Sequence, residues 1–296
     1  MKGMGKVDSV GLIDQDKDYS LTVGFQGVKG SFSEEALIQH FGYGVDMVNV
    51  EEFEDIFIEL KNNNIDYGVL PIENSSTGGI SEVYDLLNKY EFYIVGEEYV
   101  KVNHHLMAID GSSIEDIKEV YSHSQAFSQC SEFLNGHTNW KLIPYHNTAK
   151  SAEHVKKSNK KYMAAIGSIR ASKLYGLKIL KYNINTNNYN STRFVIISKH
   201  MRQDKDCNKI SAVLSLEHRA GSLYNALRAF AKNDINLLKI ESRPIKDRPW
   251  QYIFYIDFEG NLSNENAHTA VELVKESCLN FRLIGSYTKS EVEKIE

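Results

Sequence analysis

Three adjacent side chains combine hydroxyl groups with a fixed positive charge. Ser191, Thr192 and Arg193 follow a polar stretch and precede the apolar run of residues 194–197, which is typical of a buried strand. A threonine hydroxyl donates a hydrogen bond to a hydroxyl group that already leaves easily. An adjacent arginine holds a carboxylate through paired N–H donors. The alternative is a strand-end threonine beside a surface arginine.

A second polar cluster stands between a buried strand and a helix. Glu73 and Asn74 are followed by residues 75–77, Ser-Ser-Thr, and by two glycines that give the backbone freedom. Ligands of open α/β sheets bind at the carboxyl ends of strands. A capping loop would explain two or three of these residues but not five in a row, so the position favours a ligand site.

A third cluster is YSHSQAFSQC, residues 121–130, which places Ser122 and Gln129 at a strand–helix junction. Ser122 is an equally good helix N-cap. The chain has no G-x-S-x-G nucleophile elbow. Its histidines at 104, 105, 123, 137, 146 and 154 lack the spacing of zinc ligands, and no metal is expected.

The segment GFQGVKGSFSEEAL, residues 24–37, has three glycines between a strand and a helix. Their spacing is G-x-x-G-x-x-G, which disfavours a dinucleotide loop, and Lys29 precedes Gly30, which disfavours a P-loop. What remains is a helix start near Ser31 and Ser33, whose free N–H groups would receive a carboxylate. A plain N-cap at Ser33 is the alternative.

The elements that position these clusters form an α/β chain with two domains. Strands and helices alternate over residues 21–200, which indicates a mostly parallel sheet flanked by helices. The stretch VNHHLMAI, residues 102–109, is expected to cross from one lobe to another. After a polar linker, residues 208–290 show the βαββαβ order of a ferredoxin-like domain.

Composition limits the class of protein. The 296 residues are 42% apolar and 25% charged, an ordinary globular balance, and the net charge of −5 disfavours nucleic acid. Three widely spaced cysteines suit a reducing cytosol. No apolar run approaches the roughly 18 residues of a membrane span. Residues 1–20 lack a signal-peptide core and are expected to form an N-terminal extension. A cytoplasmic protein without membrane contact is expected.

Several segments, in order, resemble the prephenate dehydratase family: GFQGVKGSFSEEAL, PIENSSTGGI, SHSQAFSQC, NSTRFVII, and IESRP with WQYIFYIDFEG. The match spans about residues 21 to 288, and this order of segments is highly specific. Four positions depart from the family's usual pattern. They are Thr186 for Asp or Asn, Ser124 for Pro, Ala220 for Pro and Ser222 for Ala.

The resemblance implies a two-lobed catalytic region over residues 21–200, like periplasmic binding proteins. It would convert prephenate to phenylpyruvate with loss of CO2 and water, without metal or organic cofactor. Thr192 would donate to the leaving hydroxyl and Arg193 would hold a carboxylate. Glu73 and Asn74 would share the catalytic cleft. The substrate contacts implied are Ser31, Ser33, Ser122, Gln129 and Asn190.

The domain at residues 208–290 resembles an ACT domain, the family's amino-acid sensor. The resemblance implies L-phenylalanine as effector, bound between the subunits of a homodimer or homotetramer. The effector contacts implied are Gly221, Ser222, Leu223, Tyr224, Glu241, Ser242, Arg243 and Pro244. A plain strand ending in Pro also explains LLKIESRP. No fused chorismate mutase domain is expected before residue 20.

Two other functions compete with this hypothesis. Arogenate dehydratase performs the same chemistry on an amino-acid analogue, and the sequence does not separate the two substrates. A non-catalytic two-lobed ligand-binding regulator would be expected to lose Thr192, which is present.

Overall fold

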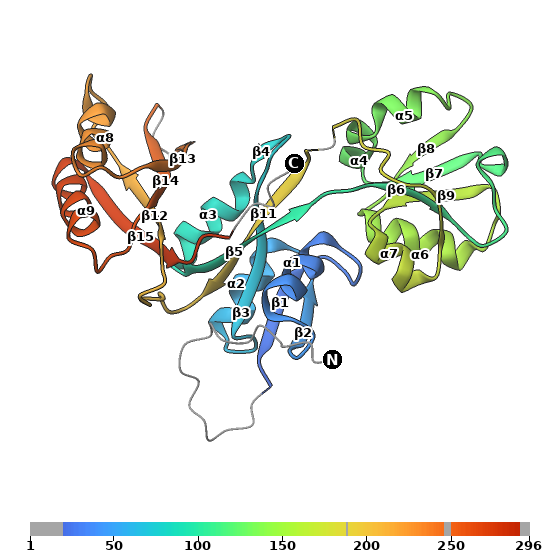
Figure 1. The fold of residues 1–296 in the computed structure, drawn as a ribbon, viewed down its shortest axis with the longest axis horizontal. Helices are drawn as coiled ribbons and strands as arrows, with labels where there is room; N and C mark the ends of the chain where they lie inside the picture. The colour runs from blue at the N-terminus through green and yellow to red at the C-terminus, as the bar shows by residue number, and fades with distance from the viewer. Residues whose placement is uncertain (1–19, 188, 246–249, 291–296) are drawn as a thin grey trace, which may run out of the picture.

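The computed structural model describes residues 20–187, 189–245 and 250–290, which form two lobes and a C-terminal unit (Figure 1). All but one residue of the expected N-terminal extension lies outside these ranges. None of the helices in the described ranges is long and apolar enough to cross a membrane.

Lobe 1 is a sheet covered by helices on both faces (Figure 1). Its chain folds into elements because apolar positions recur at strand or helix spacing, as in α2, where Ile56, Phe57 and Leu60 are buried. Its elements are β1 (Thr22–Gln26), α1 (Phe32–Phe41), β2 (Asp46–Val50), α2 (Phe53–Lys61), β3 (Tyr67–Asn74), β4 (Gly78–Gly79), α3 (Ser81–Tyr90), β5 (Tyr93–Lys101) and β11 (Ser191–Ser198).

Lobe 2 is built on a separate five-stranded sheet in the order β10-β6-β9-β7-β8. The chain enters it after β5 and leaves it before β11, so two strands of lobe 1 carry the connections. Its elements are β6 (His105–Ala108), a 3-10 helix (Ile114–Asp116), β7 (Glu119–Ser122), α4 (Ser124–Gln129), α5 (Ser131–Asn135), β8 (Lys141–Pro144), α6 (Thr148–Ser158), β9 (Met163–Gly167), α7 (Ile169–Tyr175) and β10 (Lys178–Lys181).

The C-terminal unit has the expected strand and helix order and the sheet order β13-β14-β12-β15. Two helices, α8 and α9, pack against each other on one face of its sheet (Figure 1). Its elements are β12 (Lys209–Ser215), α8 (Ser222–Lys232), β13 (Leu237–Pro244), β14 (Tyr252–Glu259), α9 (Glu265–Ser277) and β15 (Asn280–Tyr287).

The C-terminal unit and lobe 1 share one sheet across the described residues, because β15 pairs in parallel with β5 at Gly285 and Ile94. A Cβ atom added at Gly285 would lie 2.6 Å from the carbonyl oxygen of Ile94, so only glycine allows this approach. The separation into domains at residues 21–200 and 208–290 stays a prediction, since the sheet runs through both.

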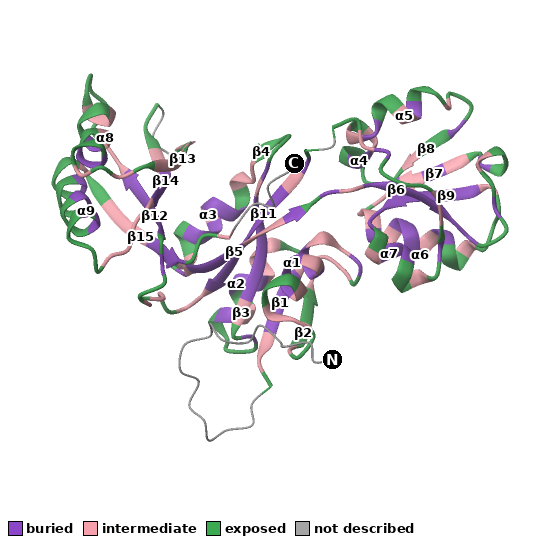
Figure 2. Ribbon diagram, in the orientation of Figure 1, coloured by how far each residue is buried: buried purple, intermediate pink, exposed green. Residues whose placement is uncertain are grey.

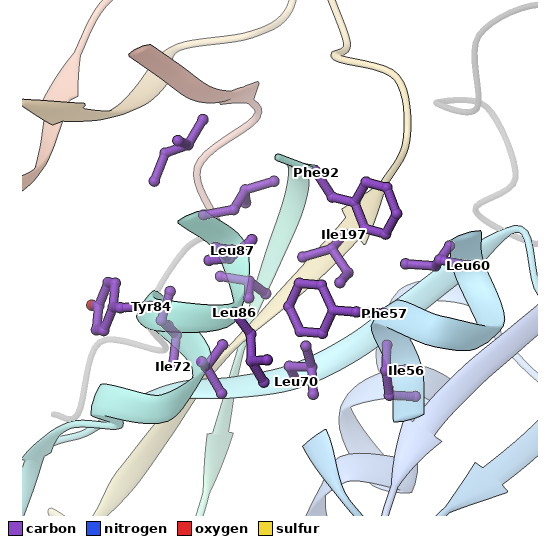
Figure 3. Close-up of a cluster of buried hydrophobic side chains, with 14 of the residues drawn as sticks. Ile56, Phe57, Leu60, Leu70, Ile72, Tyr84, Leu86, Leu87, Phe92 and Ile197 are labelled. Atoms are coloured by element: carbon purple, nitrogen blue, oxygen red, sulfur yellow. The ribbon is translucent and has the colours of Figure 1, made fainter. Parts of the chain in front are cut away.

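A single apolar core also runs between these two parts. Figure 3 shows its centre, where Phe57, Leu70 and Leu87 pack together, and the same cluster includes Ile284 and Tyr287 of the C-terminal unit. Burying one large apolar side chain contributes roughly 1.5–3 kcal/mol. Figure 2 shows the buried central strands β3 and β11 inside the helices and loops of lobe 1. These two strands carry Asn74 and Thr192.

Candidate active site

A pair of side chains, Asn74 and Thr192, joins the ends of β3 and β11. The antiparallel register places Thr192 opposite Asn74, and Asn74 Nδ2 lies 2.9 Å from Thr192 Oγ1. Both residues are buried. The sheet therefore brings two predicted residues into direct contact although 118 positions separate them along the chain.

The contacts of the Asn74 amide decide which groups donate. Its Oδ1 accepts hydrogen bonds from the backbone N–H groups of Ser76 and Thr77, at 2.9 and 3.2 Å. Its Nδ2 must then face the other way and donate to Thr192 and, at 2.8 Å, to Asn190 Oδ1. Because the Thr192 oxygen already accepts this bond, its own hydrogen remains available for another acceptor.

Asn190 supplies a second available donor beside the pair. Its Oδ1 accepts from Asn74, whereas its Nδ2 is buried without a partner among the described residues. A buried N–H group without a partner is costly, and a ligand oxygen at this position would satisfy it. The predicted residues Asn74, Asn190 and Thr192 therefore form one cluster, which we call the donor cluster.

The loop after β3 connects the donor cluster to lobe 2. Gln125, in the first turn of α4, donates from Nε2 to Thr77 Oγ1 at 3.2 Å, and Thr77 in turn donates its backbone N–H to Asn74. The sequence places Gln125 at the strand–helix junction of residues 121–130 but assigns it no role in the site. Its signal was its place in the first turn of a helix that follows a strand.

Two predicted residues of lobe 2 have internal partners. Ser122 is fully buried and donates to the Ile166 carbonyl at 2.9 Å, and its contact with substrate stays a prediction. Gln129 Oε1 lies 2.8 Å from His104 Nε2, on the connection between the lobes. The contact of Gln129 with substrate stays a prediction.

A carboxylate of the protein, Glu34, lies beside the predicted carboxylate site at the start of α1. Ser31 is the N-cap and accepts from the Glu34 N–H. The Glu34 carboxylate accepts from the Gly30 N–H at 2.7 Å and from Arg170 Nε at 2.6 Å. The N-cap is thus Ser31 and not Ser33, which is buried within the helix. The Glu34 carboxylate thus binds just before the helix, and the contact of Ser31 and Ser33 with substrate stays a prediction.

The side chain of Arg193 is not in the donor cluster, contrary to the prediction. Successive side chains of a strand point to opposite faces of the sheet, so Arg193 faces away from Thr192. Its guanidinium is only 4% exposed. Its three nitrogens donate to Glu97 Oε2 at 2.7 Å, Asp257 Oδ2 at 2.6 Å and Tyr287 Oη at 2.8 Å. Arg193 thus holds carboxylates of the protein and not the predicted carboxylate of a substrate.

This buried network balances its charges. Lys209 Nζ lies 2.8 Å from Glu97 Oε2, so two cations face two buried carboxylates, and Oε2 of the partly exposed Glu73 lies 3.8 Å from Arg193 Nη1. Burial disfavours the charge on Arg193, but Asp257 and Glu97 outweigh it and raise the pKa of the guanidinium well above its ordinary value. Burial likewise opposes the charge on Asp257, yet Arg193 and Lys209 hold its pKa below the ordinary value.

Glu73 lies on the same side as Arg193. The register pairs the two residues, and Glu73 Oε1 lies 2.7 Å from Lys239 Nζ of strand β13. The structure therefore places the Glu73 carboxylate against the C-terminal unit, whereas the prediction placed it in the catalytic cleft beside Asn74.

The two predicted effector segments lie on different elements of the C-terminal unit. Residues 221–224 form the start of α8, where Tyr224 is exposed. Residues 241–244 end β13 and contact lobe 1, where Arg243 Nη2 lies 3.3 Å from Asp85 Oδ2. Effector binding at these segments stays a prediction.

Sequence reasoning missed the network around Arg193. Its signal was a charge inside an apolar strand, as with Asp257 in YIFYIDFE, because a buried carboxylate requires a cationic or hydrogen-bonding partner. In the ranges that the structure describes, no three or more His, Cys, Asp or Glu side chains are grouped so as to hold a metal ion.

Sequence comparisons match the chain to one family. Residues 23–202 match the family described as prephenate dehydratase. A bifunctional chorismate mutase/prephenate dehydratase of Enterobacter agglomerans is 33% identical over 94% of this chain and 73% of its own length. A chloroplastic arogenate dehydratase/prephenate dehydratase of Arabidopsis thaliana is 39% identical over 91% of this chain and 72% of its own length.

The fold is similar to a solved structure of the same description. The prephenate dehydratase of Arthrobacter aurescens, crystallised with L-Phe, superimposes with a TM-score of 0.83. The match covers 91% of this chain and 90% of that one at 28% identity.

Proposed function

The chain belongs to the prephenate dehydratase family, and from this premise we propose that the donor cluster is where the family's reaction takes place. The family's reaction converts prephenate to phenylpyruvate, with loss of CO2 and water, in phenylalanine biosynthesis. The observation that carries the proposal is the free hydrogen of Thr192, which is left free because Asn74 donates to the Thr192 oxygen.

The chemistry suits a neutral donor. The carboxylate C–C bond of the ring breaks to release CO2, its electron pair moves into the ring, and the C–O bond of the opposite hydroxyl breaks. The hydroxyl group leaves with the C–O electron pair as hydroxide and takes a proton from solvent to become water. Aromatisation drives this step, so the protein needs to stabilise the departing oxygen and not to protonate it fully. Thr192 donates a hydrogen bond to that oxygen, and a fixed donor of this kind is worth roughly 10²–10³ in rate.

Asn74 and Asn190 complete the site. Asn74 orients Thr192 through the bond from Nδ2, and Asn190 offers its free Nδ2 hydrogens to a substrate oxygen. The proposed reaction requires no metal or organic cofactor, because aromatisation supplies the driving force.

The C-terminal unit is proposed to be an ACT-type sensor that binds L-phenylalanine at residues 221–224 and 241–244. Support comes from its βαββαβ order and from the L-Phe complex of the relative from Arthrobacter aurescens. We further propose a homodimer or homotetramer assembled through this unit, in the cytoplasm. Phenylalanine should raise Tm by binding the folded state and lower activity. If neither Tm nor activity changes when phenylalanine is added, the sensor role is contradicted.

Arogenate is the second candidate substrate, because the relative from Arabidopsis thaliana is named for both substrates. Measuring kcat/KM for prephenate and for arogenate under the same conditions separates them. A ratio above one in favour of arogenate would reassign the main substrate without changing the role of Thr192.

The decisive experiment follows phenylpyruvate formation from prephenate at neutral pH in wild type, Thr192→Ala and Thr192→Ser. Thr192→Ala should lower kcat by at least about a hundredfold, because the donor is gone, while thermal unfolding changes little. Thr192→Ser keeps the donor and should retain most activity. Near-normal turnover in Thr192→Ala would remove Thr192 from the mechanism.

A further inference from the structure

The residues next to Asn74 and Thr192 are both bound by the C-terminal unit. Glu73 precedes Asn74 on β3 and contacts Lys239 of β13, at 2.7 Å. Arg193 follows Thr192 on β11 and contacts Asp257 of β14, at 2.6 Å. Each strand therefore presents one side chain to the donor cluster and the next to the C-terminal unit.

These two contacts differ in how easily they change. The Arg193 contact lies in a buried network in which each guanidinium nitrogen has a partner and the charges are paired. Losing one partner of such a network leaves a buried charge and costs several kcal/mol. Ser211 also binds Asp257 Oδ1, at 2.6 Å. This network is a permanent anchor of β11.

The Glu73 contact is more exposed and has an alternative partner. The Glu73 side chain is 34% exposed, and Lys239 Nζ also lies 3.6 Å from Glu241 Oε2 on its own strand. Lysine has a flexible stem and three donors, so one ammonium group serves either carboxylate. Lys239 thus links Glu73, which adjoins Asn74, to Glu241, which belongs to a proposed effector segment.

We propose that Lys239 is a positioning residue for the dehydratase site: its ion pair with Glu73 holds the end of β3, and with it the amide that orients Thr192, in the catalytic arrangement. Shifting Lys239 from Glu73 toward Glu241 loosens that end. A ligand at Glu241 therefore changes turnover through Lys239 without touching the substrate. This inference rests on the proposed function of the donor cluster.

The test compares Lys239→Met with wild type in the full-length protein. Methionine keeps an unbranched apolar stem near the Tyr84 ring and removes the ammonium group, with its ion pairs to Glu73 and Glu241 and its contact over the Tyr84 ring, where Lys239 Nζ lies 5.8 Å from the centroid. We expect kcat to fall about three- to tenfold, the scale of one partly exposed ion pair, with KM for prephenate within about twofold. Lys239→Arg keeps a cation at this position and should therefore keep most of the wild-type kcat.

Three further measurements separate positioning from a general structural role. The inhibition constant for phenylalanine should change in Lys239→Met. Raised salt should lower kcat in wild type but not in that variant, because salt screens the exposed pair. Glu73→Gln breaks the same pair from its other end, so adding Lys239→Met to it should not lower kcat further.

Lys275→Met is the matched control. Lys275 belongs to the same unit and forms an exposed ion pair with Glu272, and its loss should leave kcat and phenylalanine inhibition unchanged. Wild-type kcat in Lys239→Met, or an additive loss in the double variant with Glu73→Gln, would overturn the inference. Wild-type protein that is inactive on both prephenate and arogenate would instead overturn the proposed function.

Discussion

At the scale of single residues, the site depends on the direction of one hydrogen bond. Thr192 donates outward only because Asn74 donates to it, and Asn74 does so only because Ser76 and Thr77 hold its oxygen. The loop after β3 thus sets the direction in which the Thr192 hydroxyl donates its hydrogen bond. A polar loop that looks suited only to capping a helix controls the reactive group through two backbone N–H groups.

Asn74→Asp tests this direction with little change in size. A carboxylate has no N–H to donate, so the Thr192 hydrogen would turn toward it and be lost to the substrate. We expect kcat for prephenate to fall by about 10²-fold or more, measured beside thermal unfolding. Ser76→Ala is the control, because its hydroxyl only approaches Asn190 Oδ1 at 3.4 Å. A kcat within twofold of wild type in Asn74→Asp would contradict the orienting role.

Sequence reasoning identified the residues of the donor cluster but not the face that each neighbour takes. Asn74, Asn190 and Thr192 were all predicted and lie together. Arg193 and Glu73 were assigned to the same cleft, yet the period of two in a strand turns them away. The alternation of side chains along a strand can be read from the sequence. The partners that Arg193 and Glu73 find in the C-terminal unit cannot be read from it.

At the scale of elements, the pairing of β15 with β5 decides how the C-terminal unit is held. Alternating patterns predicted β5 and β15 separately, and both exist. Their contact could not be predicted, because a pairing of edges depends on the docking of two units and leaves no local pattern. The sequence hints at the contact between β15 and β5 only at Gly285, since a glycine within a strand often marks a close approach of another backbone.

Gly285→Ala should weaken this junction. The added Cβ would lie 2.6 Å from the Ile94 carbonyl oxygen, and overpacking of this kind costs typically about 1–3 kcal/mol. Thermal or urea unfolding measures the loss. Gly44→Ala is the matched control, because nothing lies within 4 Å of its added Cβ. Equal stability in the two variants would show that the junction adapts to the extra methyl group.

At the scale of the whole molecule, two neighbouring histidines lie buried where the chain passes between the lobes. Burial, with the neighbouring His104, lowers the pKa of His105 from 6.5 to about 4. Burial also lowers the pKa of His104, although the bond to Gln129 opposes this. Both rings are therefore neutral in the folded protein at neutral pH.

Stability should consequently fall in acid. The unfolded chain binds a proton at His105 near pH 6.5 and the folded chain only near pH 4. The contribution of neutral His105 to the free energy of unfolding is therefore complete above pH 6.5 and is lost progressively between pH 6.5 and pH 4. The loss for one proton reaches about 1.4 kcal/mol per pH unit. His105→Asn keeps an acceptor for the Asn183 N–H and should make the free energy of unfolding depend less on pH. His218→Asn changes a histidine at an exposed position and should leave the pH dependence as it is in wild type. An unchanged slope in His105→Asn would contradict this assignment.

The shared sheet also determines how the molecule comes apart. A chain divided near residue 200 in its sequence would be expected to unfold as two successive domains. Because β5, β11 and β15 belong to one sheet and one apolar core, lobe 1 and the C-terminal unit should instead lose amide hydrogen-exchange protection together. Lobe 2, with its own sheet and cores, should exchange independently. The boundary between cooperative units then crosses the chain twice, at the two connections to lobe 2, and the strands β12, β14 and β15 fold with strands β1 to β5, which lie more than a hundred residues earlier in the chain.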